Sequence, residues 1–150
     1  MGRKNRMQNR IQNRPQNRIG KTTKMLSEHH TVHRGDVFFA KLGYHEGTSI
    51  QNGCRPVLVL SNDKGNYHSN TISIIPLTGC FKRPDLPCHI LLYPEDIKNR
   101  HQKLSVSTVL TEQVTTISKS DLRGYVGRIE DSTLLGKIEY ALSIHLGLCG

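Results

Sequence analysis

The distribution of apolar residues along the chain changes at Arg34. From there onward, short apolar and β-branched runs alternate with turn residues, a pattern typical of a β-rich domain. The continuous apolar run Pro56–Leu60 suits a buried strand. The strands predicted from these runs are Val37–Leu42, Pro56–Leu60, Thr71–Leu77, His89–Tyr93, Ser107–Ile117 and Gly124–Ile129.

Polar segments separate the predicted strands. Residues Gly43–Gly53 form a polar loop, and Asn62–Asn66 carries strong turn chemistry. Pro76 has no backbone N–H to donate to a neighbouring strand. We therefore expect the C-terminal end of the predicted strand Thr71–Leu77 to lie at a sheet edge or at a bulge.

The last element is predicted to be a helix. Asp131 and Ser132 are both N-cap candidates, and Gly147 is a natural C′ residue after which Leu148 can fold back on the last turn. The apolar positions at helical spacing are Leu134, Leu135, Ile138, Ala141, Leu142 and Leu146. Short strands followed by one helix predict a mainly β fold, a small barrel closed or capped by that helix.

The net charge of +9 is concentrated near the N-terminus. Residues 1–33 hold eight Lys or Arg and one acid, whereas residues 34–150 hold thirteen and eleven, so the two parts carry +7 and +2. The basic balance therefore gives no argument that the folded part binds nucleic acid. We divide the chain into a basic, low-complexity extension, 1–33, and a folded domain, 34–150.

The extension repeats Gln-Asn-Arg at residues 8–10, 12–14 and 16–18 and has almost no apolar residues to bury, so we expect it to be disordered. It is either an arm that grips RNA phosphates or a solvated extension, and Met25 is a plausible start of translation. His29, His30 and His33 form a small cluster before the domain, but a metal site there would need further ligands that the local sequence does not offer.

Cysteine usage and hydropathy exclude several classes of protein. The domain is long enough for one core without a disulfide or metal staple. The cysteines at 54, 80, 88 and 149 form no Cys-x-x-Cys pair, so we predict no metal and no cofactor. No signal-peptide core or 18-residue apolar run is present, and we expect a cytoplasmic protein with reduced thiols and no membrane partner.

The strongest functional signal is a set of local strings in a fixed order. They are Arg34-Gly35-Asp36-Val37, Ser49-x-Gln51-x-Gly53-x-Arg55-Pro56-Val57-Leu58, Ser61-Asn62-Asp63, Pro76-Leu77-Thr78, Pro87-x-His89-Ile90, Glu112-Gln113-Val114-x-Thr116-Ile117 and Ala141-Leu142-x-Ile144-x-Leu146-Gly147-Leu148. Each string alone is weak. Together, over residues 34–148, they resemble the MazF/PemK family of toxin endoribonucleases.

The resemblance implies a small SH3-like barrel of the MazF/PemK/CcdB type that forms a homodimer. It implies the toxin component of a type II toxin–antitoxin system, which cuts single-stranded RNA, mostly mRNA, selectively and without a metal, and so inhibits translation and growth. The implied partners are the RNA substrate and a cognate antitoxin, with operator DNA bound only through the antitoxin complex.

By the same resemblance, the catalytic arginine is Arg55 and the catalytic threonine is Thr78. Metal-free RNA cleavage can use the ribose 2′-hydroxyl as nucleophile, and a planar guanidinium suits the charge that builds on the phosphate oxygens. Thr78 would bind the phosphate or orient the 2′-hydroxyl, and the expected products carry 2′,3′-cyclic phosphate and 5′-hydroxyl ends. The structural alternatives are a surface ion pair for Arg55 and an ordinary strand-end role for Thr78.

The resemblance also marks candidate RNA-binding residues, which are Ser49, Gln51, Gly53, Glu112 and Gln113. Ser49 and Gln51 would otherwise belong to a plain polar loop, and a structural hydrogen-bonding role for Glu112 and Gln113 is an equal alternative. His45 matches no family position but is a candidate general base. We expect His89 to serve strand packing.

Two functions from other classes stay open. Gyrase-inhibiting toxins share this barrel, so a non-catalytic inhibitor of DNA gyrase or another protein is the main alternative. A decayed toxin that binds RNA without cutting it is the other.

The sequence departs from the family pattern at Gly79, where relatives often have a small hydroxyl residue. The Gly43–Gly53 loop influences substrate choice, so no RNA sequence preference can be transferred from the family.

Overall fold

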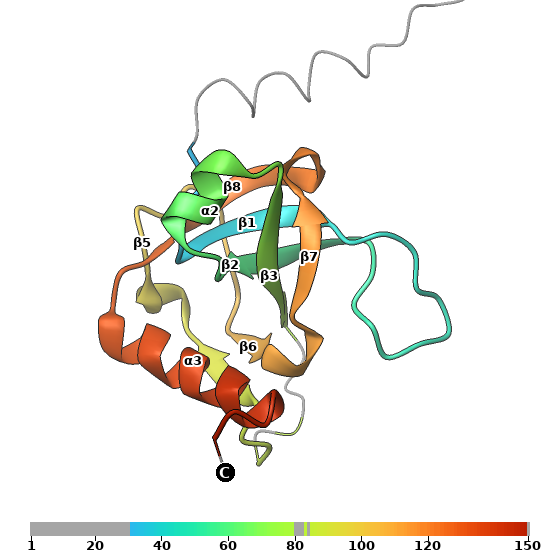
Figure 1. Ribbon diagram of the computed structural model, residues 1–150, viewed down its shortest axis with the longest axis vertical. Helices are drawn as coiled ribbons and strands as arrows, with labels where there is room; N and C mark the ends of the chain where they lie inside the picture. Colours follow the sequence, from blue (N-terminus) through green and yellow to red (C-terminus); the bar gives the residue numbers. More distant parts are fainter. Residues whose placement is uncertain (1–30, 80–82, 84, 150) are drawn as a thin grey trace, which may run out of the picture.

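The computed structural model describes residues 31–79, 83 and 85–149 (Figure 1). The Gln-Asn-Arg repeats, the candidate start at Met25 and the histidines at 29 and 30 lie outside these residues. The predictions about them are therefore untested.

The described part is a mainly β half-barrel with a C-terminal helix, as predicted. All strand pairs are antiparallel, in the order β4-β6-β3-β2-β1-β8-β5, and β7 pairs with β3. The strands are β1 (Asp36–Lys41), β2 (Cys54–Val59), β3 (Thr71–Thr78), β4 (His89–Leu92), β5 (Ile97–Lys98), β6 (Ser107–Leu110), β7 (Thr115–Ser118) and β8 (Leu122–Ile129). The helices are α2 (Asp63–His68) and α3 (Ser132–His145), with 3-10 turns η1 (Pro94–Asp96), η2 (Thr111–Gln113) and η3 (Lys119–Asp121).

The sheet is curled so that both of its faces are buried. Alternate residues of β1 enter two hydrophobic clusters, Val37 one and Phe38 the other, and Leu58 and Val57 of β2 divide in the same way. The Val37 cluster includes the fully buried Ile138 of α3. Figure 1 shows α3 against one side of the half-barrel and the β1–β2 loop projecting on the opposite side of the view.

Helix α3 begins and ends as the sequence predicts. Of the two N-cap candidates, Asp131 is the cap, because its side chain accepts from the N–H groups of Thr133 and Leu134. At the other end Gly147 adopts a φ of +69°, and the N–H of Leu148 donates to the carbonyl of Ser143 at 2.9 Å. No helix among the described residues is long and apolar enough to cross a membrane.

The predicted strand Ser107–Ile117 is wrong as a single element, because η2 divides it into β6 and β7. Leu77 of β3 pairs with Val109, so an unbroken ladder would pair Ile74 with Glu112, three residues further on. Ile74 instead pairs with Thr115. The turn η2 thus inserts three residues opposite β3, and it carries Glu112 and Gln113 out of the ladder.

One further local prediction needs correction, and one is confirmed in its second alternative. Residues Asn62–Asn66 belong to a short helix rather than a simple turn, because the Asn62 side chain caps α2 by accepting from the N–H of Gly65 at 2.8 Å. The sequence predicts an edge or a bulge at Pro76, and the second alternative is confirmed: β3 is central, with β2 on one side and β6 and β7 on the other, and the η2 insertion lies opposite Pro76. Pro76 lies where β3 changes neighbours from β7 to β6, the place where a missing donor disturbs the ladder least.

Candidate functional site

Arg55 and Thr78 lie on adjacent strands at one end of the half-barrel. Val57 of β2 pairs with Pro76 of β3, and two residues further along each strand this register aligns Arg55 with Thr78. Since residues two apart on a strand point to the same face, both side chains belong to the face of Val57. The ladder between β2 and β3 ends at Val57 and Pro76, so the two predicted catalytic residues lie just beyond it, on adjacent strands, and do not form a pair themselves.

The two side chains differ in accessibility. Arg55 is exposed, and its Nε donates to the carbonyl of Asn52 at 3.0 Å, so its guanidinium is held near the base of the β1–β2 loop. Among the described residues no carboxylate forms an ion pair with it. Thr78 is only 5% exposed and pairs with Thr108 of β6, so its side chain is largely covered.

The β1–β2 loop, Gly43–Gly53, is closed at its base by its two terminal glycines. The N–H of Gly53 donates to the carbonyl of Gly43 at 3.0 Å, and both glycines have positive φ, +70° and +88°. Between them the loop is mostly exposed, and Ser49 is among the exposed residues. His45, the candidate general base, is half-buried in the same loop.

Gln113 attaches this loop to η2. Its Oε1 accepts from the N–H of Gln51 at 2.8 Å, and its Nε2 donates to the carbonyl of Ser49 at 3.0 Å. Both polar atoms of this side chain are thus engaged with loop backbone. The arrangement favours the structural alternative for Gln113, as a residue that holds the loop rather than one that reads a base.

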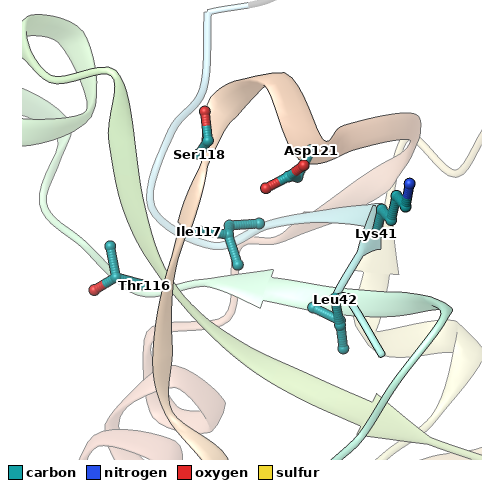
Figure 2. A pocket seen from close by; sticks show the side chains of 7 residues that line it. Lys41, Leu42, Thr116, Ile117, Ser118 and Asp121 are labelled. Carbon is teal, nitrogen blue, oxygen red and sulfur yellow. The ribbon is translucent and has the colours of Figure 1, made fainter. Parts of the chain in front are cut away.

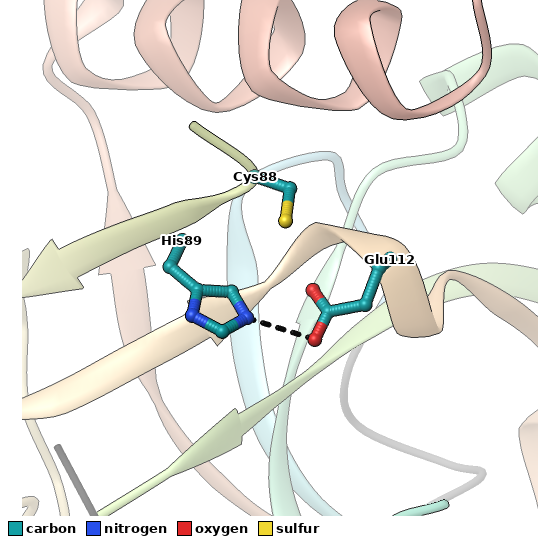
Figure 3. A group of neighbouring side chains, drawn as sticks. All are labelled: Cys88, His89 and Glu112. Atoms are coloured by element: carbon teal, nitrogen blue, oxygen red, sulfur yellow. Dashed lines mark hydrogen bonds and ion pairs between the residues drawn. The ribbon is translucent and has the colours of Figure 1, made fainter. Parts of the chain in front are cut away.

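Glu112 turns the other way, toward the start of β4. Its Oε1 lies 2.9 Å from Nε2 of His89, and the thiol of Cys88 is close to both (Figure 3). Burial raises the pKa of the Cys88 thiol, and the neighbouring Glu112 carboxylate raises it further, so Cys88 is a poor nucleophile. His89 does pack within the protein, as predicted, but as the partner of a carboxylate.

A surface pocket of about 310 Å³ adjoins the base of the loop (Figure 2). It is lined by Lys41, Leu42, Gly43, Thr116, Ile117, Ser118 and Asp121. Lys41 pairs with Cys54, whereas Arg55 pairs with Ala40, so the side chains of Lys41 and Arg55 belong to opposite faces of the sheet.

Comparison with known proteins agrees with this architecture. Residues 33–146 match the family model of PemK-like, MazF-like toxins of type II toxin–antitoxin systems. A solved mycobacterial endoribonuclease is similar with a TM-score of 0.61 and 24% identity, over 79% of this chain and 93% of that chain. A mycobacterial endoribonuclease in complex with its cognate antitoxin has a TM-score of 0.58 and 26% identity, over 80% and 97%. MazF from Deinococcus radiodurans has a TM-score of 0.62 and 21% identity, over 79% and 98%.

Proposed function

Because this chain belongs to the PemK-like, MazF-like toxins of type II toxin–antitoxin systems, we propose that it is a metal-independent endoribonuclease that cuts single-stranded mRNA. Two similar solved proteins are described as endoribonucleases. On this proposal the chain acts in the cytoplasm, where cutting mRNA stops translation and growth.

One observation carries the proposal: Arg55 and Thr78 lie two residues beyond the last pair of the adjacent strands β2 and β3, beside an exposed loop. An exposed guanidinium and a hydroxyl are groups that can bind a phosphodiester and hold the charge that builds on its reacting phosphate. The adjacent β1–β2 loop offers backbone groups and polar side chains to the RNA bases that flank this phosphate. This combination favours RNA chemistry over inhibition of a protein target.

The proposed reaction is a transfer within the RNA. The ribose 2′-oxygen forms a bond to the adjacent phosphorus and loses its proton, while the bond from phosphorus to the 5′-oxygen breaks and that oxygen gains a proton. Arg55 stabilises the negative charge that builds on the phosphate oxygens, because a fixed guanidinium is multidentate and remains charged. Thr78 hydrogen-bonds the phosphate or orients the 2′-hydroxyl, and the products carry 2′,3′-cyclic phosphate and 5′-hydroxyl ends.

The β1–β2 loop is the proposed determinant of RNA sequence preference. Ser49 is exposed and Gln51 is half-buried, so their side chains can meet bases while Gln113 fixes the loop backbone. Gly53 closes the loop directly before β2, which keeps the reading segment close to Arg55. Glu112 contributes indirectly, through the position of η2.

The proposed partners follow from the family. A solved relative is bound to its cognate antitoxin, and we propose an antitoxin whose flexible segment covers the same loop and Arg55. We also propose a homodimer, and contact with operator DNA only through the antitoxin complex. A monomer by light scattering at micromolar concentration would count against the dimer.

The test is cleavage of a long single-stranded RNA by the purified full chain in EDTA, with the new 5′ ends mapped. We expect discrete cuts, and we expect Arg55→Ala to lower the cleavage rate at least about 100-fold while the fold stays intact. Arg100→Ala is the matched control, because Arg100 is an exposed arginine near Gly127, toward the opposite end of the sheet.

The other outcomes would change either the role of Arg55 or the function proposed for the protein. An Arg55→Ala protein that cuts at the wild-type rate would remove Arg55 from the reaction. RNA that is bound but stays intact would indicate a decayed toxin. Intact RNA together with an effect on DNA supercoiling would indicate a gyrase inhibitor of the same fold.

A further inference from the structure

Three side chains of different chemistry converge where β4 begins beside η2. The Sγ of Cys88, a ring nitrogen of His89 and a carboxylate oxygen of Glu112 all lie within 4.8 Å of one another (Figure 3). Neighbours in sequence supply the first two, and the three-residue insertion at η2 supplies the third. A thiol, an imidazole and a carboxylate are three of the ligand types that Zn²⁺ prefers.

The backbone around this cluster is anchored. The carbonyl of Cys88 accepts from both the N–H and the Oγ1 of Thr111, at 3.2 and 2.6 Å. This pair of bonds holds the start of β4 against η2, on which Glu112 is the next residue. The His89 side chain is 6% exposed, so its ring is confined by packing. The three groups therefore occupy preorganised positions rather than mobile ones.

The hydrogen-bond geometry leaves room for a cation. Nδ1 of His89 lies 3.1 Å from the carbonyl oxygen of Arg83, and because that oxygen can only accept, Nδ1 carries a hydrogen. In a neutral ring Nε2 then presents a lone pair to Glu112 Oε1, at 2.9 Å. Two lone pairs at this distance repel unless a proton or a metal ion lies between them. The other oxygen of Glu112, Oε2, is buried and has no hydrogen-bond partner among the described residues apart from the Cys88 thiol, whose pKa the Glu112 carboxylate raises.

We propose that Cys88, His89 and Glu112 form a Zn²⁺ site, bound through Sγ, Nε2 and a carboxylate oxygen. The Nδ1 contact to the Arg83 carbonyl is the second interaction that metal-ligating histidines usually make. A thiolate among the ligands favours Zn²⁺ over Mg²⁺ or Ca²⁺. In tetrahedral zinc sites the ligand atoms lie roughly 3–4 Å apart, so only a small inward movement is needed. Zn²⁺ replaces the thiol proton of Cys88, and a water completes the fourth position.

The site would stiffen the β1–β2 loop. Glu112 and Gln113 are consecutive in η2, and Gln113 holds the loop through Ser49 and Gln51. A metal that fixes Glu112 against β4 fixes η2, and through it the attachment of the loop. The binding of Zn²⁺ itself does not rest on the proposed RNA cleavage, and its test requires no RNA.

The test is titration of the reduced full chain with Zn²⁺ in competition with a chromophoric chelator. We expect the highest-affinity binding to have a stoichiometry of one Zn²⁺ per chain. We expect Cys88→Ser to weaken this binding at least about tenfold. Cys149→Ser is the matched control, because Cys149 is a partly buried free cysteine near the C-terminus. In the unmodified chain, Zn²⁺ should slow the alkylation of Cys88, read by peptide mass spectrometry, far more than that of exposed Cys54.

Either measurement can overturn the site. If the chain binds no Zn²⁺ at equimolar concentration, the Nε2–Oε1 contact is an ordinary imidazolium–carboxylate pair and the site is refuted. Zn²⁺ that binds equally well to the Cys88→Ser and unmodified proteins is held elsewhere, which also refutes it. If Cys88→Ser alters the circular dichroism spectrum, the alkylation experiment decides, because it needs no variant.

Discussion

At the residue scale, Arg34, Gly35 and Asp36 join the start of β1 to the rest of the domain. Asp36 is fully buried and accepts from Nε of Arg128 at 2.7 Å and from the N–H of His33 at 2.8 Å. The bond to Asp36 raises the pKa of the Arg128 guanidinium. The string that served as a family marker in the sequence is thus a structural anchor, with a buried charge that is paired and hydrogen-bonded.

Gly35 occupies a position in this segment where a larger residue would not fit. It has a φ of +89°, and a Cβ at this position would lie 2.8 Å from the carbonyl oxygen of Ile129. We expect Gly35→Ala to lower the free energy of unfolding by about 3 kcal/mol, from backbone strain and steric overlap together. The measurement is urea denaturation of the purified protein.

Gly47→Ala separates the two effects. Gly47 also has a positive φ, +75°, but a Cβ there would meet no atom within 4 Å. The backbone term alone should lower the free energy of unfolding by about 1 kcal/mol. Equal losses in the two variants would show that overlap with Ile129 contributes nothing.

At the element scale, the 3-10 turn η2 connects the sheet to the candidate site. Its three residues are extra to the ladder that β6 and β7 make with β3. Thr111 bonds to Cys88, Glu112 to His89 and Gln113 to the β1–β2 loop. An insertion in one strand therefore organises two neighbouring segments, a role typical of bulges beside functional sites.

Removing the Gln113 side chain should loosen the loop without unfolding it. In Gln113→Ala we expect the Gln51 amide to exchange with solvent about tenfold faster, because it loses the Oε1 acceptor 2.8 Å away. The measurement is residue-resolved hydrogen exchange. The amides of Leu42 and Gly53 are internal controls, because they bond to the carbonyls of Gly53 and Gly43. Unchanged exchange at Gln51 would mean that Gln113 does not hold the loop.

At the scale of the whole molecule, the fold and the charge occupy different parts of the chain. The hydrophobic clusters begin at Val32, whereas +7 of the net charge of +9 lies in residues 1–33. Stability should therefore depend on the half-barrel with α3, and nonspecific attraction to RNA phosphates should depend largely on the N-terminal residues.

Removal of residues 1–24 should leave the thermal midpoint nearly unchanged. A loss of 1 kcal/mol would shift the Tm of a domain of this size by about 4 °C, so a shift well below that is expected for 25–150. The comparison chain 36–150 should melt at a clearly lower temperature, since it lacks Val32 and the bonds of Arg34 to Leu60 and Glu139. A large loss in 25–150 would show that the first residues contribute to the folded state.

The sequence by itself determined the local elements, because their signals are local. Alternating and continuous apolar runs located the long central strands, and Asp131 and Gly147 marked the ends of α3. The order of short strings also predicted the family that residues 33–146 match, and by that resemblance it proposes Arg55 and Thr78 as catalytic. Hydrophobic period and capping chemistry act within a few residues, so they can be read without knowledge of the fold.

Only the tertiary structure decided which distant groups meet. The division of Ser107–Ile117 depends on β3 having two successive partners, which no property of those residues alone reveals. The same insertion brings Glu112 to His89 and Gln113 to the β1–β2 loop, and the ladder of β2 with β3 joins Val57 to Pro76. These contacts join residues far apart in sequence, and their geometry is set by strand pairing and packing of the whole domain rather than by local propensity.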